Sequence, residues 1–124
     1  MNKLTKDQLD MINRLQPFFK EKMGGWLEGD MFYSYQFNRL LYFCSGCHNV
    51  DILRARNDKL LCIPKVFDWG QPQRSLWCMV DWTKFYLEES HGTVDVHKNT
   101  DEILCMEADP FTALLKILCE QEGV

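Results

Sequence analysis

The stretch of sequence that organises the chain is residues 59–82, which reads KLLCIPKVFDWGQPQRSLWCMVDW. Two apolar arms, residues 60–67 and 76–82, flank a polar turn that contains Gly70 and Pro72. Three of the four tryptophans of the chain lie here: Trp69, Trp77 and Trp82. Because large rings carry the most apolar area per residue, they are expected to be buried. The sequence therefore predicts that residues 59–82 form the middle of the hydrophobic core.

The first helix is predicted near the N-terminus. Thr5 and Gln8 have the spacing of a capping box, in which each side chain bonds to the backbone of the other. Apolar residues then recur at helical spacing up to Phe19. Pro17 interrupts the pattern and predicts a kink or the start of a new short helix. Gly24 is a suitable C-terminal cap because glycine adopts the left-handed conformation without strain.

A second helix is predicted at the C-terminal end. Asp109 is an N-cap residue, Pro110 occupies the first helical position, and Gly123 lies just past the end. The apolar residues follow the i, i+3, i+4, i+7, i+8 pattern of an amphipathic helix. They are Phe111, Leu114, Leu115, Leu118 and Cys119. We expect this stripe to pack on a sheet.

Short aromatic and β-branched segments between the helices predict strands. The segments are residues 30–36, 39–44, 60–63, 83–89, 93–97 and 102–107. Residues 90–92 end in glycine and predict a hairpin connection, whereas residues 75–80 fit a helical turn or a strand equally well. The predicted fold is α+β: an antiparallel sheet packed by N-terminal and C-terminal amphipathic helices. A length of 124 residues predicts a single domain, residues 1–124.

The charge balance and hydropathy disfavour two classes of partner. Fourteen Lys and Arg against eighteen Asp and Glu give a net charge of −4, and nucleic-acid affinity comes mainly from neutralising phosphates. No run of about 18 apolar residues is present that would predict a membrane span. The N-terminal residues show no export signal, so the chain is expected in the cytoplasm. Partners are therefore expected to be proteins, including a second copy of the chain.

The motif Cys44-Ser-Gly-Cys47-His48 carries the most suggestive chemistry. Its C-x-x-C-H spacing fits c-type haem attachment, half of a zinc site or a redox dithiol. The missing export signal weighs against haem, and no helix that would lower a thiol pKa is evident after the motif. We favour two thiols in a loop and keep zinc bound by Cys44, Cys47 and His48 as the alternative. The other cysteines, at positions 62, 78, 105 and 119, are expected in the core because thiols are readily buried.

Catalytic patterns are not found elsewhere in the sequence. There is no glycine-rich phosphate loop, nucleophile elbow or H-E-x-x-H helix. Glu88 and Glu89 are expected in a solvated segment, and His97 on the polar face of a strand. No catalytic residue and no cofactor is assigned, and a non-enzymatic protein is favoured over an enzyme.

The aromatic content suggests a binding surface. The chain has sixteen aromatic rings (four Trp, four Tyr and eight Phe), and several of them lie near predicted loops. Exposed aromatic side chains cluster at protein interfaces because rigid rings give contact area at low entropic cost. The candidate interface residues are Trp26, Tyr33, Tyr35 and Trp69.

Residues 63–82 and 108–123 resemble small uncharacterised proteins encoded in bacteriophages and prophages. The resemblance implies a cytoplasmic bacterial or phage setting and a small accessory role, and it assigns no catalytic residue. Together with the aromatic content, it predicts a non-enzymatic accessory protein that acts through protein–protein contacts. The alternative is a small structural-zinc or thiol-dependent protein that uses Cys44 and Cys47.

Overall fold

A computed structural model describes residues 4–25, 27, 29–35, 37–43, 60–90, 92–99, 102–107 and 109–124. The chain divides into two compact units, residues 1–64 and residues 65–124. Each unit has one long helix and one three-stranded antiparallel sheet. The single domain expected from the length stays a prediction.

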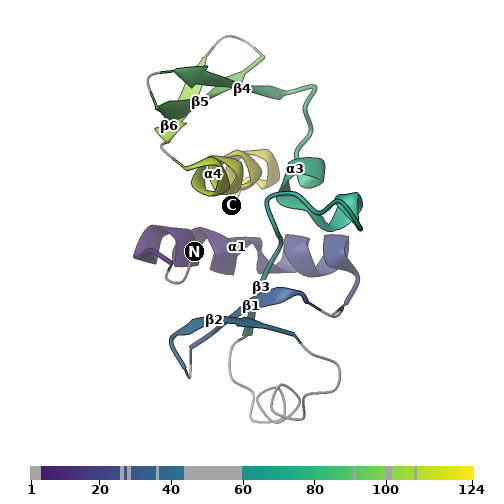
Figure 1. The fold of residues 1–124 in the computed structure, drawn as a ribbon. Coiled ribbons are helices and arrows are strands. Elements are labelled where there is room, and N and C mark those ends of the chain that lie inside the picture. The colour runs from purple at the N-terminus through teal and green to yellow at the C-terminus, as the bar shows by residue number, and fades with distance from the viewer. Residues whose placement is uncertain are drawn as a thin grey trace. The chain divides into compact units, whose positions relative to one another are not determined.

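The first unit packs helix α1 on sheet A (Figure 1). Its elements are α1 (Lys6–Met23), β1 (Met31–Ser34), β2 (Arg39–Tyr42) and β3 (Leu60–Ile63). The strands are antiparallel in the order β2-β1-β3, with Phe32 of β1 opposite Leu41 on one side and Cys62 on the other. Strand β1 is therefore central, and α1 packs on β3.

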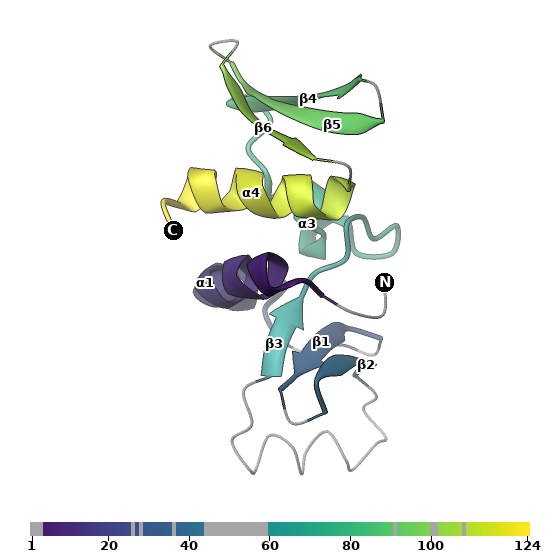
Figure 2. The same ribbon diagram turned by 90° about the vertical axis from the view of Figure 1, so that its left-hand side faces the viewer.

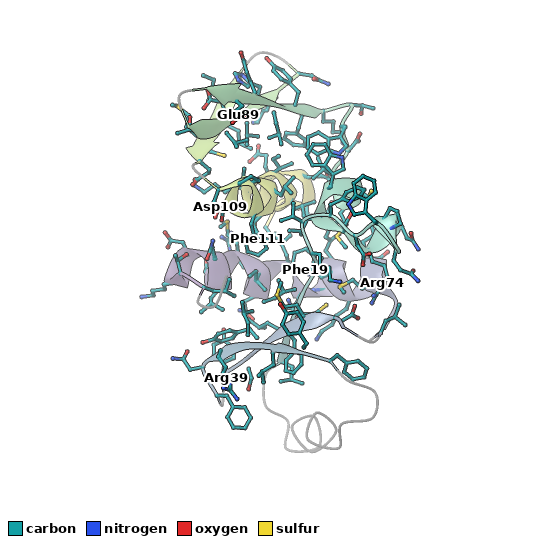
Figure 3. The ribbon with its side chains drawn as sticks, in the orientation of Figure 1. Phe19, Arg39, Arg74, Glu89, Asp109 and Phe111 are labelled. Atoms are coloured by element: carbon teal, nitrogen blue, oxygen red, sulfur yellow. The ribbon has the colours of Figure 1, made fainter. Side chains whose placement is uncertain are left out.

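Helix α1 begins and ends where the sequence predicts. The Thr5 side chain accepts a hydrogen bond from the Gln8 backbone N–H, and the Gln8 side chain accepts one from the Thr5 N–H. Gly24 is the C-cap with φ of 68°. The helix continues through Pro17, so the alternative of a new helix starting there is wrong. The apolar side of α1 is fully buried at Ile12, Leu15 and Phe19, and Figure 3 labels Phe19.

A polar side chain joins α1 to sheet A at the edge of β3. The Gln16 amide nitrogen Nε2 donates to the Cys62 carbonyl oxygen at 2.8 Å, and the Cys62 N–H donates to Gln16 Oε1 at 2.8 Å. Gln16 thus bonds the outer edge of β3 as the backbone of a fourth strand would. No local sequence pattern predicts this contact, because its partners lie 46 residues apart.

The second unit packs helix α4 on sheet B (Figure 2). Its elements are the 3₁₀ turn η1 (Pro72–Arg74), α3 (Leu76–Met79), β4 (Phe85–Ser90), β5 (Thr93–Lys98), β6 (Ile103–Glu107) and α4 (Pro110–Glu122). The strands are antiparallel in the order β4-β5-β6. Ser90 pairs with Thr93, and Gly92 has φ of 79°, which confirms the predicted hairpin. Because Ser90 belongs to β4, the connection is shorter than the predicted residues 90–92.

Helix α4 confirms the C-terminal prediction. The Asp109 side chain accepts from the Phe111 N–H, and Gly123 is a left-handed C-cap. All five residues of the predicted stripe are buried. No basic residue lies in the last turn of α4, but Lys98 of β5 places its ammonium 2.8 Å from Glu120. This cation lies where the negative end of a helix dipole favours one.

The α+β class with N- and C-terminal helices on antiparallel sheet is confirmed, although the strands divide between two sheets. Strand periodicity identifies the face that is buried, but it does not identify the partner strand. The sequence therefore located the strands and left their division between sheets A and B undetermined.

The prediction that the tryptophans form the core is wrong. The buried residues near the middle of the chain are aliphatic: Leu61, Ile63, Leu76 and Met79. Trp69 is 89% exposed, and Trp77 is also exposed. The single turn of α3 turns Leu76 and Met79 inward, and this directs Trp77 and Cys78 outward. Cys78 is accordingly exposed and is not a core thiol, whereas Cys62 and Cys119 are buried.

The expected surface position of His97 is also wrong. Its side chain is buried, with 8% of the residue exposed. The imidazole stacks on Tyr86, its direct partner on β4, with ring centroids 4.6 Å apart and planes 3° apart. The β5–β6 register shifts between Val96 and His97. The alternation of polar and apolar residues along a strand does not predict this burial, because the ring that covers His97 comes from the neighbouring strand.

Candidate interaction surface

A closed loop displays the most exposed aromatic residue of the described chain. We call residues 65–77 the tryptophan loop. Its two ends are joined by backbone hydrogen bonds: the Leu76 N–H donates to the Lys65 carbonyl at 2.8 Å, and the Trp77 N–H donates to the Val66 carbonyl at 3.0 Å. The nine residues between these ends project as one closed segment.

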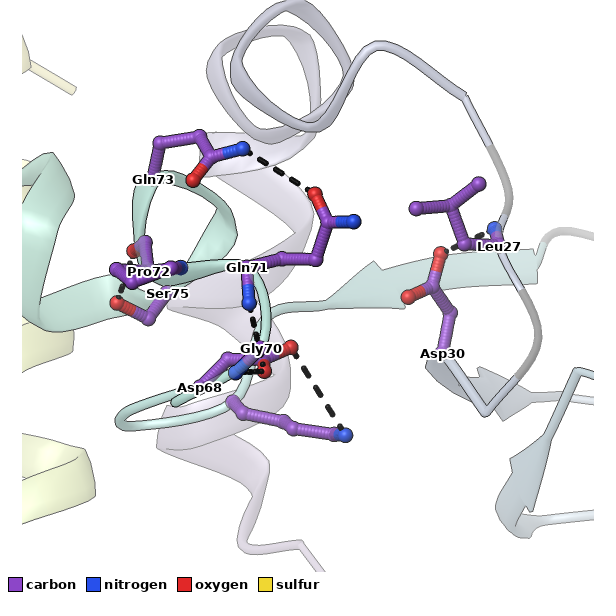
Figure 4. Close-up of polar contacts among 9 residues, drawn as sticks. Leu27, Asp30, Asp68, Gly70, Gln71, Pro72, Gln73 and Ser75 are labelled. Atoms are coloured by element: carbon purple, nitrogen blue, oxygen red, sulfur yellow. Dashed lines mark hydrogen bonds and ion pairs between the residues drawn. The ribbon is translucent and has the colours of Figure 1, made fainter.

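Internal hydrogen bonds hold the loop in shape (Figure 4). The Asp68 carboxylate oxygen Oδ1 accepts from the backbone N–H of Gly70 at 3.0 Å and of Gln71 at 3.1 Å. On the other side of the turn, the Ser75 hydroxyl donates to the Pro72 carbonyl at 2.6 Å. Side chains of Asp and Ser stabilise tight turns in this way. The loop therefore has a defined conformation without a hydrophobic interior of its own.

Two aromatic pairs lie at this loop. Phe67 and Trp69 meet edge to face, with ring centroids 4.6 Å apart and planes at 70°. Trp77 packs against Trp82 at 4.4 Å, and the Trp82 indole N–H donates to the Trp77 carbonyl at 2.8 Å. Trp69 thus contacts a neighbouring ring on one side and leaves most of its surface to solvent.

The charges around the loop are paired with each other. Lys65 Nζ lies 4.0 Å from Asp68, and Lys84 Nζ lies 3.9 Å from Asp81. The hydrogen bonds from the side chain and backbone of Thr83 lower the pKa of the Asp81 carboxyl. These two pairs carry no net charge, and Arg74, the other charged residue of the loop, is buried, so recognition there depends on the exposed rings.

A second exposed aromatic group lies on the β1–β2 hairpin of sheet A. Tyr35, Phe37 and Tyr42 are exposed, and the Arg39 guanidinium lies 5.8 Å from the Phe37 ring centroid. Tyr33 is only 4% exposed and packs edge to face on Tyr35 at 5.2 Å. Its hydroxyl donates to the Asn38 side chain. Tyr33 therefore supports the hairpin from inside, and it has little surface to offer a partner.

The predicted site residues differ in what can be said of them. Tyr35 and Trp69 are exposed, as an interface requires. Trp26, Cys44, Cys47 and His48 lie outside the described residues. Phe37, Tyr42 and Trp77 are also exposed, although they are not among the residues predicted for the interface. Tyr42 is exposed on the outer strand β2 and Trp77 on the outward side of α3, and neither position can be recognised before the fold is known.

Within the described ranges, no group of three or more His, Cys, Asp or Glu side chains is arranged to hold a metal ion. No described helix has the length and apolar character needed to cross a membrane.

Comparisons with known proteins found no relatives. No protein-family model matches the chain, and neither the curated proteins nor the solved structures include a significant match.

Proposed function

We propose that the chain is a non-enzymatic accessory protein that binds a protein partner through the tryptophan loop. The observation that carries this proposal is Trp69, which is 89% exposed at a loop closed by backbone bonds and braced by Asp68 and Ser75. Exposing an indole to water forgoes the free energy that its burial would contribute. A function at the surface accounts for that loss.

The rigidity of the loop favours binding. Tryptophan is among the residues that most often dominate the affinity of protein interfaces. A partner that binds a preformed loop does not have to overcome the entropy of ordering it. Because the nearby charges are paired, we expect the partner to present an apolar or aromatic pocket to Trp69 and not a charged surface.

The proposal also includes the cellular setting of the protein. The resemblance of residues 63–82 and 108–123 to phage and prophage proteins suggests a cytoplasmic accessory role, and an interaction module fits such a role. The zinc- or thiol-dependent alternative at Cys44 and Cys47 stays a prediction. No observation among the described residues favours it.

Site-specific photo-crosslinking would test the proposal. A benzophenone amino acid replaces Trp69 in one protein and Gln73, an exposed residue of the same loop, in another. Each protein is irradiated in an extract of its source cells. We expect a discrete crosslinked product from position 69 that excess unlabelled wild type suppresses and excess Trp69→Ala does not. Equal suppression by the two competitors would refute the tryptophan loop as the binding site.

Sedimentation velocity would identify a partner that is a second copy of the chain. If the loop mediates self-association, the wild type sediments as an oligomer that Trp69→Ala dissociates, and Tyr42→Ala serves as an exposed aromatic control. A monomeric wild type together with a position-69 crosslink would assign the loop to a different protein.

A further inference from the structure

The two faces of sheet B have different surroundings. On one face Val96 is fully buried, and Lys98 forms an ion pair with Glu120 of α4. Glu107 on the same face pairs with Lys116 of that helix. Directly paired residues share a face of a sheet, as do residues two apart on a strand. The pairings of β4, β5 and β6 therefore define a second face turned away from α4, which we call the outer face and which includes Tyr86, Glu88, Asp95, His97, Ile103 and Met106.

The outer face exposes two apolar side chains. Ile103 is 53% exposed and Met106 is 61% exposed. Both belong to β6, which has a neighbouring strand on one side only. The solvated face of an antiparallel sheet normally carries polar residues, and an apolar patch beside polar residues is typical of an interaction site. Methionine suits such a site because its flexible side chain adapts to the shape of a partner.

Two carboxylates lie beside these apolar side chains. Asp95 is directly opposite Glu88 on one side and Met106 on the other. Like charges directly opposite each other destabilise a sheet. Glu88 has His97 as its partner, with Nε2 3.3 Å from Oε2, and the Asp95 carboxylate accepts a hydrogen bond from the Thr93 hydroxyl at 3.1 Å. The outer face is therefore negative in either protonation state of His97, because the charge of Asp95 is left.

The basic residues of sheet B do not offset this charge. Among the described residues of β4, β5 and β6, no outer-face position holds lysine or arginine. Lys98 lies on the other face, where it pairs with Glu120. Charged surfaces favour partners of the complementary sign. A partner of the outer face is therefore expected to be basic.

We propose that the outer face of sheet B binds a segment of a protein partner that carries lysine or arginine next to apolar side chains. The apolar side chains cover Ile103 and Met106, and the cation lies near Asp95. Directly opposite residues have their Cβ atoms about 4.5–5.5 Å apart, so one short segment reaches both Met106 and Asp95. This basic partner differs from the uncharged pocket proposed for Trp69, and the inference does not depend on the tryptophan loop.

Binding of defined peptides to the full chain tests this inference. The probe is a short synthetic peptide of alternating lysine and leucine, and two control peptides replace every lysine by glutamate or every leucine by serine. Calorimetry should show that the lysine–leucine peptide binds at least about tenfold more tightly than either control. In heteronuclear NMR it should shift the amide signals of β5 and β6. Absence of binding, equal binding of the three peptides, or shifts confined to residues 65–77 would overturn the proposal.

The chain offers a matched control for the charge. The Glu88 side chain is 64% exposed, so Glu88→Gln is expected to fold, and it should weaken binding of the lysine–leucine peptide by about two- to fivefold. Glu89→Gln makes the same change of charge on the other face of β4 and should leave the affinity unchanged (Glu89 is labelled in Figure 3). Equal affinities of these two variants would show a non-specific attraction and overturn the proposal.

A second pair of variants tests the apolar contact. Met106→Ser should weaken binding of the lysine–leucine peptide by about tenfold, whereas Val124→Ser removes an exposed apolar side chain elsewhere in the same unit and should have no effect. Equal effects of the two variants would contradict the proposal. Sedimentation of the peptide-free protein addresses the other occupant: self-association that Met106→Ser abolishes would assign the outer face to a second copy of the chain and overturn the proposal.

Discussion

The two long helices are fastened to their sheets in different ways. Helix α4 contacts sheet B through a continuous apolar stripe, with ion pairs such as Lys116–Glu107 at its margin. Helix α1 also buries an apolar face, but it adds the Gln16 amide, which bonds both backbone groups of Cys62. The attachment of α4 adds partly exposed ion pairs to its apolar stripe, whereas the attachment of α1 includes a buried polar contact.

This difference affects what each attachment tolerates. An apolar stripe loses stability in proportion to the volume removed from it. A buried polar contact fails in another way, because removal of one partner leaves the other buried without a hydrogen bond. Variants of the two helices distinguish these two kinds of attachment by the free energy of unfolding that each variant loses.

Truncation of a buried phenylalanine in each long helix should have the greatest effect. Phe19→Ala in α1 and Phe111→Ala in α4 should each lower the free energy of unfolding by about 3–5 kcal/mol, because both rings are buried (Figure 3). Urea unfolding followed by circular dichroism measures the loss, and Phe37→Ala is the exposed control. One shared transition would support the single domain, whereas two separate transitions would contradict it.

Removal of the polar contact of α1 should cost less. Gln16→Leu keeps an apolar side chain of similar size but leaves the Cys62 N–H and carbonyl without the amide, at about 1–3 kcal/mol. Asn13→Leu on the exposed side of the same helix is the matched control. If the two variants unfold at the same urea concentration, the amide contributes nothing to the attachment of α1.

Removal of an ion pair at the margin of α4 should cost still less. Lys116→Met retains the aliphatic part of the side chain and removes the pairing with Glu107. Partly exposed ion pairs contribute about 0–1 kcal/mol, so the unfolding midpoint should shift less than in Gln16→Leu. A larger shift of the midpoint in Lys116→Met than in Gln16→Leu would show that α4 depends on this ion pair more than α1 depends on its amide.

Thiol alkylation compares the two helix–sheet interfaces without a mutation. Cys62 of sheet A is buried, Cys105 of sheet B is half-buried, and Cys78 is exposed. Burial raises the pKa of the Cys105 thiol, which keeps it protonated, and therefore unreactive, to higher pH. Iodoacetamide labelling at pH 8, read by peptide mass spectrometry, should modify Cys78 first, then Cys105 and last Cys62. Equal rates for Cys62 and Cys105 would contradict the deeper burial of Cys62.

The sequence predicted what local signals encode. Thr5, Gln8, Asp109 and Gly123 marked the helix ends because caps act within a few residues. The Gln16–Cys62 contact joins residues 46 positions apart, and the burial of His97 depends on Tyr86 across the sheet. No local pattern encodes such contacts.

The aromatic residues mark another limit of the sequence. Size alone placed Trp69 and Trp77 in the core, but Leu76 and Met79 took the inward positions of α3. The position of Trp69 beside the turn residues Gly70 and Pro72 predicts a surface residue, and Trp69 is exposed. The interface role itself stays a prediction.

The Gln16 amide has a consequence for association between molecules. An open strand edge can recruit a strand from another chain, which is a common route to aggregation. At Cys62 the N–H and carbonyl that would receive such a strand are already bonded to α1. An incoming strand would have to displace Gln16 first. The helix that stabilises sheet A therefore also hinders the addition of a strand from another molecule at this position.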